Sequence, residues 1–348
     1  MVFGDRFTGK PSMSDHASQD ARAAAEVAEV DAIAARLARA RDAVDRVIVG
    51  QRDVIEQTFI TLLAGGHALL VGVPGLAKTK LVTTLGTVLG LDAGRIQFTP
   101  DLMPADITGA EVLEETQTGE RVFRFIKGPV FCQLLMADEI NRASPRTQSA
   151  LLQAMQEAHV TVAGQRYDLP RPFHVLATQN PLEQEGTYPL PEAQLDRFLL
   201  QIDVTYPSLA AERAMLLQTT GDHEPVAEAA LDPETLMSAQ RLVRRLPIGE
   251  SVVDAIVSLV RSARPEDETA AEPVRAHLAW GPGPRAGQAL MLAVRARALL
   301  DGRIAPSVDD VIALAPPILR HRMALNYAAR AEGETLDALI GRLLAPLR

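Results

Sequence analysis

Hydrophobic and polar positions divide this chain into a part where short apolar runs recur and a part where the pattern is helical. The apolar runs have the length of strands and lie at residues 67–71, 132–137, 173–178 and 199–204. Uninterrupted apolar runs of this length are typical of strands buried in a sheet. From residue 208 onward, apolar positions follow the helical period. The pattern predicts strands and helices up to about residue 207 and helices after it.

The N-terminal region predicts a disordered start followed by a helix. Residues 1–17 are small and polar, and we expect them to be disordered. Residues 18–40 form a predicted helical extension, because apolar side chains there and just beyond recur at steps of three and four residues. They are Val30, Ile33, Leu37, Ala40, Val44 and Val47. We favour packing of this stripe on the core of the protein, and a helix for a partner or a neighbouring subunit is the alternative.

A boundary between two domains is predicted at residues 206–208, which read Tyr-Pro-Ser. Ser208 is a suitable cap for a following helix, and Asp232 with Pro233 repeats the pattern of a cap followed by proline. A length of 348 residues fits two domains, or three small ones. The predicted domains are residues 41–207 and residues 208–348.

Two β-hairpins are predicted within the first domain. One covers residues 111–125 and turns at residues 117–120, and the other pairs residues 159–162 with residues 166–169 around Ala163-Gly164. Most connections between elements are about 4–6 residues long, so these segments are too long to be plain connectors.

A phosphate-binding loop is predicted where the first apolar run ends. Residues 72–79 read Gly-Val-Pro-Gly-Leu-Ala-Lys-Thr. Glycines let the backbone turn tightly and direct N–H groups at phosphate oxygens, and the start of the following helix favours the same negative charge. Lys78 is expected to reach the β- and γ-phosphates, and Thr79 is expected to bind Mg²⁺ through its hydroxyl. The predicted nucleotide-binding residues of this loop are Gly72, Pro74, Gly75, Leu76, Ala77, Lys78, Thr79 and Lys80.

Ala77 departs from the usual loop pattern, which has glycine before the lysine. An alanine is tolerated if the position has helical φ and ψ, whereas it would be strained if φ is positive. We expect helical values at Ala77.

An acidic pair follows the second apolar run. Asp138 and Glu139 come directly after residues 132–137, which is the Walker B pattern. Asp138 is expected to hold Mg²⁺ through its water shell, because this ion prefers oxygen ligands and keeps several waters. Glu139 is expected to act as the general base that polarises the attacking water. Two exposed acids at a strand end are common alone and improbable at this distance after such a loop.

Three further polar residues are candidates for catalysis. Asn180 follows the third apolar run and can position water or contact the γ-phosphate, although an asparagine before proline usually makes a turn. Arg197 precedes the fourth run, and Arg285 follows Gly-Pro-Gly-Pro at residues 281–284. An arginine directed at a γ-phosphate raises the rate by roughly 10³–10⁵. By itself, each arginine is more typical of a surface salt bridge.

The composition excludes some classes of function. The formal net charge is −9 and the pI about 5.4, which argues against a constitutive nucleic-acid binder. One cysteine excludes an internal disulfide, and no apolar run nears about 18 residues, so we expect a cytoplasmic protein without direct membrane insertion.

Cys132 is expected in the core. His321, between Arg320 and Arg322, is expected in a solvated basic turn.

Together these elements resemble the AAA+ ATPases, and within them the MoxR family, over about residues 40–348. Residues 97–109, with Phe-Thr-Pro-Asp-Leu-Met-Pro at 98–104, are the most discriminating stretch. The other matching stretches are residues 47–51, 72–79, 138–142, 177–181, 190–198 and 283–286. The resemblance implies a P-loop α/β core, with a parallel sheet and helices on both faces, and a C-terminal all-α lid domain. It also implies that Ala77 is a variant that the family uses.

The resemblance assigns roles to further residues and implies partners. Val49 and Gly50 would lie near the adenine, and Asn180 resembles sensor 1. Arg197 resembles the arginine finger that reaches the nucleotide of a neighbouring subunit. Arg285 resembles sensor 2, acting in cis or across the interface. The implied protein hydrolyses ATP with Mg²⁺ in a homo-hexameric ring and remodels or matures a client protein. A von Willebrand A-domain protein is the implied partner, and metal insertion is one implied purpose.

Two alternatives stay open at this point. A nucleic-acid motor related to the minichromosome helicases shares this layout, although the acidic pI and the MoxR-type segments count against it. A scaffold that binds nucleotide without hydrolysis would not need the complete set of lysine, aspartate, glutamate and arginine.

Overall fold

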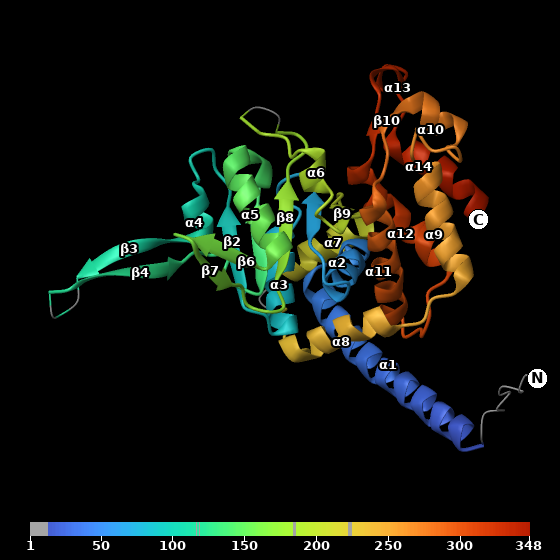
Figure 1. Cartoon of the computed structure of the whole chain (residues 1–348), viewed down its shortest axis with the longest axis horizontal. Helices are drawn as coiled ribbons and strands as arrows, with labels where there is room; N and C mark the ends of the chain where they lie inside the picture. Colours follow the sequence, from blue (N-terminus) through green and yellow to red (C-terminus); the bar gives the residue numbers. More distant parts are fainter. Residues whose placement is uncertain (1–12, 116, 118, 184–185, 222–224) are drawn as a thin grey trace, which may run out of the picture.

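The computed structural model describes residues 13–115, 117, 119–183, 186–221 and 225–348. Five parallel strands form the central sheet in the order β2-β5-β8-β1-β9 (Figure 1). They are β1 (Ala68–Val71), β2 (Ala93–Gln97), β5 (Leu134–Asp138), β8 (His174–Gln179) and β9 (Leu200–Asp203). The four apolar runs therefore form four of these strands, and the predicted parallel sheet is confirmed.

The sheet is buried on both faces, which explains why its strands are apolar without alternation. Leu134 and Met136 pack in one hydrophobic cluster with α1 (Met13–Val47), α2 (Arg52–Leu63) and α3 (Lys78–Leu89). Leu135 and Ala137 pack in a second cluster with α5 (Pro145–Glu157). Successive side chains of a strand point to opposite faces, so each face needs its own apolar set. Cys132 is buried in the second cluster, as predicted.

Helices surround this sheet and build a second body beside it (Figure 1). Those of the first part are α2 (Arg52–Leu63), α3 (Lys78–Leu89), α4 (Pro104–Thr108), α5 (Pro145–Glu157) and α6 (Glu192–Leu195). Those that follow are α7 (Leu209–Thr219), α8 (Pro233–Arg245), α9 (Glu250–Ser262), α10 (Glu272–His277), α11 (Pro284–Leu300), α12 (Val308–Leu319), α13 (Tyr327–Ala331) and α14 (Leu336–Leu344). Ser208 and Asp232 cap α7 and α8 by accepting backbone N–H bonds, as predicted. The second body is helical apart from one short antiparallel pair, β10 (Leu278–Trp280) with β11 (Ala324–Leu325).

The first helix, α1 (Met13–Val47), differs from the predicted extension at both ends. Residues 13–17 are helical, so the disordered start was predicted too long, and residues 1–12 lie outside the described part. The helix also continues past residue 40 without a break. Its predicted apolar stripe is buried against α2, α3, α8 and α11, which confirms packing on the core. The domain limits at residues 207 and 208 stay a prediction. No helix in the described ranges is both long and apolar enough to cross a membrane.

Both predicted hairpins are present. β3 (Gly109–Glu115) pairs with β4 (Arg121–Lys127) and projects from the body, and β6 (His159–Val162) pairs with β7 (Gln165–Asp168) (Figure 1). Phe125 of the first hairpin stacks on Tyr167 of the second, with ring centroids 4.0 Å apart. This contact joins the base of the projecting hairpin to the second hairpin.

Among the described histidines, His174 and His321 are buried and His67 is half-buried, and His321 corrects a prediction. It lies in the 3₁₀ helix η2 (Arg320–Arg322) and is 4% exposed, because its ring bonds the Phe198 carbonyl oxygen at 3.0 Å. It does not form a solvated turn. His67 directly precedes β1 and His174 is the first residue of β8, and each ring bonds a backbone carbonyl oxygen. Burial lowers the pKa of His67 to about 3, helped by His174, and the pKa of His174 to about 4.

These histidines predict that the protein loses stability in mild acid. Because the folded pKa values lie below the usual value near 6.5, the unfolded chain takes up protons between about pH 6.5 and pH 4 while the folded chain does not. The free energy of unfolding should fall by up to about 1.4 kcal/mol per pH unit for each of the two. Urea unfolding at pH 7.5, 6.5 and 5.5 measures this loss. Equal stability at the three pH values would contradict it.

Candidate functional site

The predicted phosphate-binding loop lines a cavity of about 410 Å³ at the C-terminal edge of the sheet. The loop connects β1 to α3, and residues 74–80 line the cavity together with Asp138, Glu139, Thr178 and Asn180. Gly75 has φ +84°, a left-handed value that favours glycine. A Cβ on Gly72 would lie 2.5 Å from the carbonyl oxygen of Val204, which directly follows β9, so this close approach requires glycine there. The fold thus brings the predicted loop and the predicted acidic pair together.

Lys78 is directed back into the loop. Its Nζ donates a hydrogen bond to the Gly72 carbonyl oxygen at 2.5 Å. Burial lowers the pKa of Lys78, and the nearby carboxylates of Asp138 and Glu139 oppose this effect. The ammonium group therefore lies within the electrostatic reach of the two acids that follow β5.

Ala77 has a left-handed backbone, so the prediction of helical values was wrong. Its φ is 55° and its ψ 20°, and α3 begins only at the next residue. The position before the helix must reverse the loop, which is why glycine is usual there. For an L-residue, left-handed values cost roughly 1–2 kcal/mol.

Replacement of Ala77 by glycine should therefore stabilise the protein. The relief of strain exceeds the additional freedom of glycine in the unfolded chain, which costs about 0.4–1 kcal/mol, so we expect a net gain of about 0.5–1 kcal/mol. Ala338→Gly, at an exposed helical position of α14, is the matched control and should lose about 1 kcal/mol. Urea unfolding measures both changes. A loss of stability in both variants would show that Ala77 is not strained.

Asp138 ends β5 with both carboxylate oxygens engaged. The Thr178 hydroxyl donates to Oδ1 at 2.6 Å, and Arg95 Nη2 donates to Oδ2 at 2.7 Å. Thr178 lies on the adjacent strand β8, and Arg95 lies on the edge strand β2. The side chain of Asp138 is 14% exposed, whereas that of Arg95 is 52% exposed. One oxygen thus has a fixed neutral partner and the other an exposed cationic partner.

Glu139 is held by side chains from both sides. Gln97 Nε2 donates to Glu139 Oε2 at 2.8 Å, and Arg142 Nη1 donates to the same oxygen at 2.9 Å. Its backbone is left-handed, with φ 55°, and its N–H donates to the Thr178 hydroxyl at 2.8 Å. The hydrogen bond to Glu139 also raises the pKa of Arg142. Glu139 is therefore fixed beside Asp138 with its carboxylate paired.

Sequence reasoning missed the four residues that hold this acidic pair: Arg95, Gln97, Arg142 and Thr178. The sequence features that could have pointed to these four residues were weak. Arg95 and Gln97 are two positions apart on one strand, so their side chains share a face. Thr178 lies on the strand that leads to Asn180, which was already a candidate site residue. These residues reach the acidic pair only because of which strands become neighbours in the sheet.

The other predicted nucleotide contacts lie around the loop. Asn180 is buried, lines the cavity and accepts the Leu182 N–H at 3.1 Å, so it makes a turn while facing the site. Val49 and Gly50 form the turn after α1 and do not line this cavity. Gln51, which follows them, donates to the Leu76 carbonyl oxygen at 3.0 Å. This bond connects the turn to the phosphate-binding loop.

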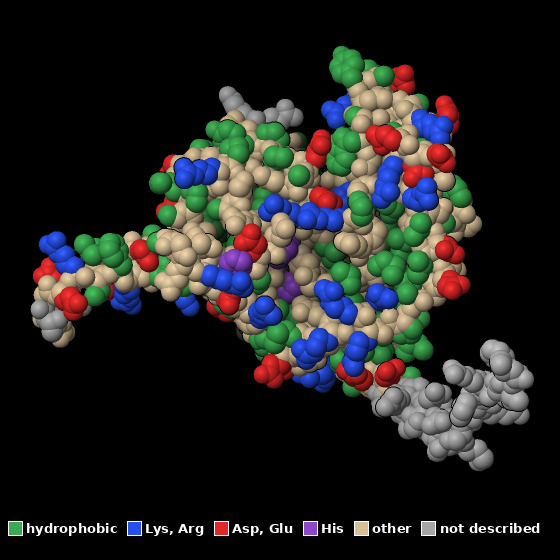
Figure 2. All heavy atoms as spheres, viewed as in Figure 1, with side chains coloured by type: hydrophobic (Ala, Val, Ile, Leu, Met, Phe, Trp, Pro, Cys, Tyr) green, Lys and Arg blue, Asp and Glu red, His purple; other side chains and the backbone are tan. Residues whose placement is uncertain are grey.

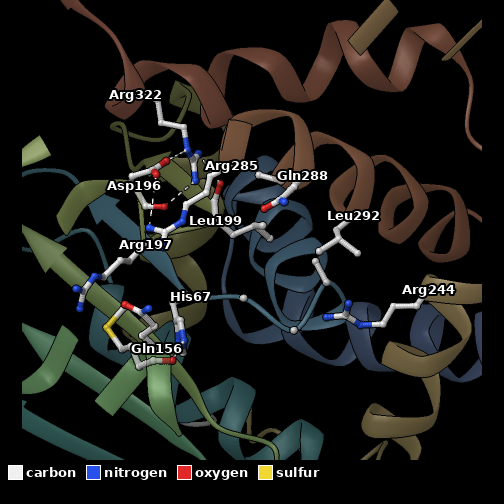
Figure 3. Close-up of a pocket in the computed structure, with 15 residues that line it drawn as sticks. His67, Gln156, Asp196, Arg197, Leu199, Arg244, Arg285, Gln288, Leu292 and Arg322 are labelled. Carbon is white, nitrogen blue, oxygen red and sulfur yellow. Dashed lines mark hydrogen bonds and ion pairs between the residues drawn. The ribbon is translucent and has the colours of Figure 1, made fainter. Parts of the chain in front are cut away.

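The two candidate arginines line a different cavity, of about 300 Å³ (Figure 3). Arg285, at the start of α11, lies 3.6 Å from Asp196, and Arg197 has no acidic partner among the described residues. Arg322 is 3% exposed and bonds Asp196 at 2.8 Å. Basic side chains surround the hollow on this face (Figure 2). The fold therefore does not bring Arg197 and Arg285 to the phosphate-binding loop of the same chain.

The comparisons with known proteins agree with this arrangement. The model of the ATPase family associated with various cellular activities (AAA) matches residues 67–200, and the AAA lid domain matches residues 270–343. Chaperone MoxR1 of Mycobacterium tuberculosis is 42% identical over 88% of this chain and 81% of its own length. Protein MoxR of Paracoccus denitrificans is 31% identical over 90% of this chain and 96% of its own length.

A solved structure has the same fold. The crystal structure of a protein from Cytophaga hutchinsonii superposes with a TM-score of 0.85 and 37% identity, and the match covers 93% of this chain and 97% of the other. The lid match and this superposition agree with the helical second body beside the sheet. The chain belongs to the MoxR family of AAA+ ATPases.

Proposed function

We propose that this chain hydrolyses ATP in a ring of identical subunits, in which each active site is completed by the neighbouring copy. The observation that carries the proposal is the division of the candidate residues between two cavities. Lys78, Asp138 and Glu139 border one cavity, and Arg197 and Arg285 border the other. An arginine of one copy that inserts beside the loop of the next would complete the set.

The oxygen atoms of the first cavity fit a magnesium ion. Thr79 lies in the first turn of α3 and Asp138 ends β5, and both line the cavity. A hydroxyl oxygen is a ligand that Mg²⁺ accepts, and a carboxylate can hold the ion through the waters that it keeps. When bound, the ion would neutralise charge on the β- and γ-phosphate oxygens. Thr79 and Asp138 are the residues that would hold it.

The remaining residues of the site would bind the phosphates, orient the attacking water and stabilise the charge of the transition state. The N–H groups of residues 75–80, including those at the start of α3, would donate hydrogen bonds to phosphate oxygens, and Lys78 would meet the β- and γ-phosphates. Glu139 would orient water and accept its proton, and Asn180 would contact the γ-phosphate from the position directly after β8. Arg197, from the neighbouring copy, would stabilise charge in the transition state. Arg285 would act across the same interface, since it shares the cavity of Arg197.

The adenine is proposed to lie near Val49 and Gly50. This placement is supported by the bond from Gln51 to Leu76, which holds the turn after α1 against the loop. At the cavity that holds Arg197 and Arg285, Arg322 of the lid bonds Asp196 and donates to the carbonyl oxygens of Phe198 and Leu199, so it joins the lid to the segment before β9. A change of lid angle would therefore move the arginine-bearing surface with it.

The biological role proposed for this ATPase follows from the family. The assembly is a homo-hexamer that remodels or matures a client protein in the cytoplasm, with a von Willebrand A-domain protein as partner and metal insertion as one purpose. The relative named Chaperone MoxR1 supports action on proteins. The projecting β3–β4 hairpin, with Phe123 72% exposed, offers apolar surface for such contacts.

Phosphate release and sedimentation of the purified chain test this proposal together. ATP with Mg²⁺ should be hydrolysed, and the nucleotide should shift the chain from smaller species to a ring. A chain that hydrolyses ATP equally well as a monomer would contradict the shared site. Added DNA serves as the control for a nucleic-acid motor, and several-fold faster hydrolysis with DNA would favour that alternative.

A further inference from the structure

The salt bridge between Arg95 and Asp138 places a cation on the carboxylate that is proposed to hold magnesium. Arg95 Nη2 lies 2.7 Å from Asp138 Oδ2, and Thr178 occupies Oδ1. We propose that Arg95 is a resident counter-ion of the nucleotide-free chain, and that it leaves Asp138 when Mg²⁺ and nucleotide bind. Arg95 is thus a positioning residue of the site.

The two oxygens of Asp138 differ in what they can retain. Thr178 is a neutral donor, so its bond to Oδ1 is compatible with a metal on the other side of the carboxylate. A guanidinium group on one carboxylate oxygen repels a divalent ion that the same carboxylate holds through water. Arg95 is half exposed, and an exposed salt bridge contributes little to stability, so its release costs little.

The release of Arg95 would also change the environment of Glu139. The same Nη2 atom of Arg95 donates to Gln97 Oε1 at 3.0 Å, and Gln97 Nε2 donates to Glu139 Oε2. The chain Asp138–Arg95–Gln97–Glu139 therefore connects the metal-holding acid to the proposed general base. When Arg95 leaves, Gln97 loses one of the two contacts that orient its amide.

This inference rests on the proposed nucleotide site, and its test measures binding instead of hydrolysis. The full chain is titrated with Mg²⁺ in the presence of a fluorescent N-methylanthraniloyl ADP, and the midpoint of the Mg²⁺ dependence is recorded. Arg95→Ala should lower this midpoint by about two- to fivefold, as expected for the loss of one exposed competing charge. Arg95→Lys, which keeps the charge, should lie closer to wild type. Arg124→Ala is the matched control, since Arg124 pairs with Glu114 at 3.3 Å on the hairpin and should change nothing.

The other possible results would overturn either the inference about Arg95 or the proposed function. An unchanged midpoint in Arg95→Ala and in Arg95→Gln, with both variants folded by thermal melting, would overturn the inference. Weaker nucleotide binding of these variants in EDTA would also overturn it, because Arg95 would then contact phosphate directly. A wild-type chain that binds no nucleotide with Mg²⁺ would contradict the proposed function itself. Arg95→Gln retains a hydrogen-bond donor without the charge, so it replaces the alanine variant if that variant is unstable.

Discussion

Arg197→Ala should lower the rate of ATP hydrolysis by roughly 10³–10⁵ in the assembled protein. Arg197 has no acidic partner among the described residues and borders a cavity that excludes the phosphate-binding loop of its own chain. Its removal should therefore leave the fold and nucleotide binding almost unchanged while the transition state loses a positive charge. Phosphate release under saturating ATP, with sedimentation to confirm assembly, measures the effect.

A mixture of two inactive variants provides the control for this result. Lys78→Ala removes the proposed phosphate contact of one cavity, and Arg197→Ala removes the proposed contribution of the other. If a site is shared, rings assembled from both variants contain interfaces in which Lys78 of one copy meets Arg197 of the next. Activity should then reappear on mixing. Full activity of Arg197→Ala alone, or no recovery on mixing, would show that Arg197 does not act across an interface.

Glu139→Gln should lower hydrolysis by roughly 10²–10⁴ and retain nucleotide binding. Glutamine keeps the size of the side chain and can still bond Arg142 or Gln97, but it cannot accept a proton from water. Single-turnover phosphate release measures the chemical step, and equilibrium binding of labelled ATP measures retention. The variant should therefore hold ATP without consuming it.

Glu114→Gln is the matched control for the general base. Glu114 is on the projecting hairpin and makes an exposed pair with Arg124, so the same chemical change there should leave hydrolysis unchanged. If Glu139→Gln hydrolysed ATP as fast as wild type, the assignment of Glu139 as the general base would be wrong. If Glu139→Gln lost binding as well, the paired carboxylate would have a structural role in the loop.

The acidic pair illustrates how far sequence reasoning reaches in this protein. Asp138 and Glu139 were predicted because an apolar strand followed by two acids is a local pattern. Arg95 and Gln97 hold the same pair from 43 and 42 positions earlier in the chain, and that local pattern carries no sign of them. Their contacts exist because β2 lies beside β5 in the sheet. Strand order depends on how all helices pack, so a pattern within one segment does not contain it.

The error at Ala77 has a related cause. Residue type alone favours helical values for alanine, and the residues that follow do form a helix. The backbone at residue 77 is set by the need to join β1 to α3 at the edge of the sheet, and this geometry imposes φ 55°. His321 was misplaced similarly, because its charged neighbours suggested solvent while the lid buries it against Phe198.

The sequence by itself determined the elements and the chemistry of the loop. Apolar period, caps and spacing act over a few residues, so four strands of the sheet, the helical second part, the phosphate-binding loop and the acidic pair were readable, whereas the edge strand β2 was not predicted. Only the tertiary structure decided which side chains meet. It placed Arg95 on Asp138, buried Arg322 against Asp196, and put Arg197 and Arg285 in a cavity apart from Lys78. The physical reason is that these contacts join segments tens to more than a hundred residues apart, and packing of the whole core selects them.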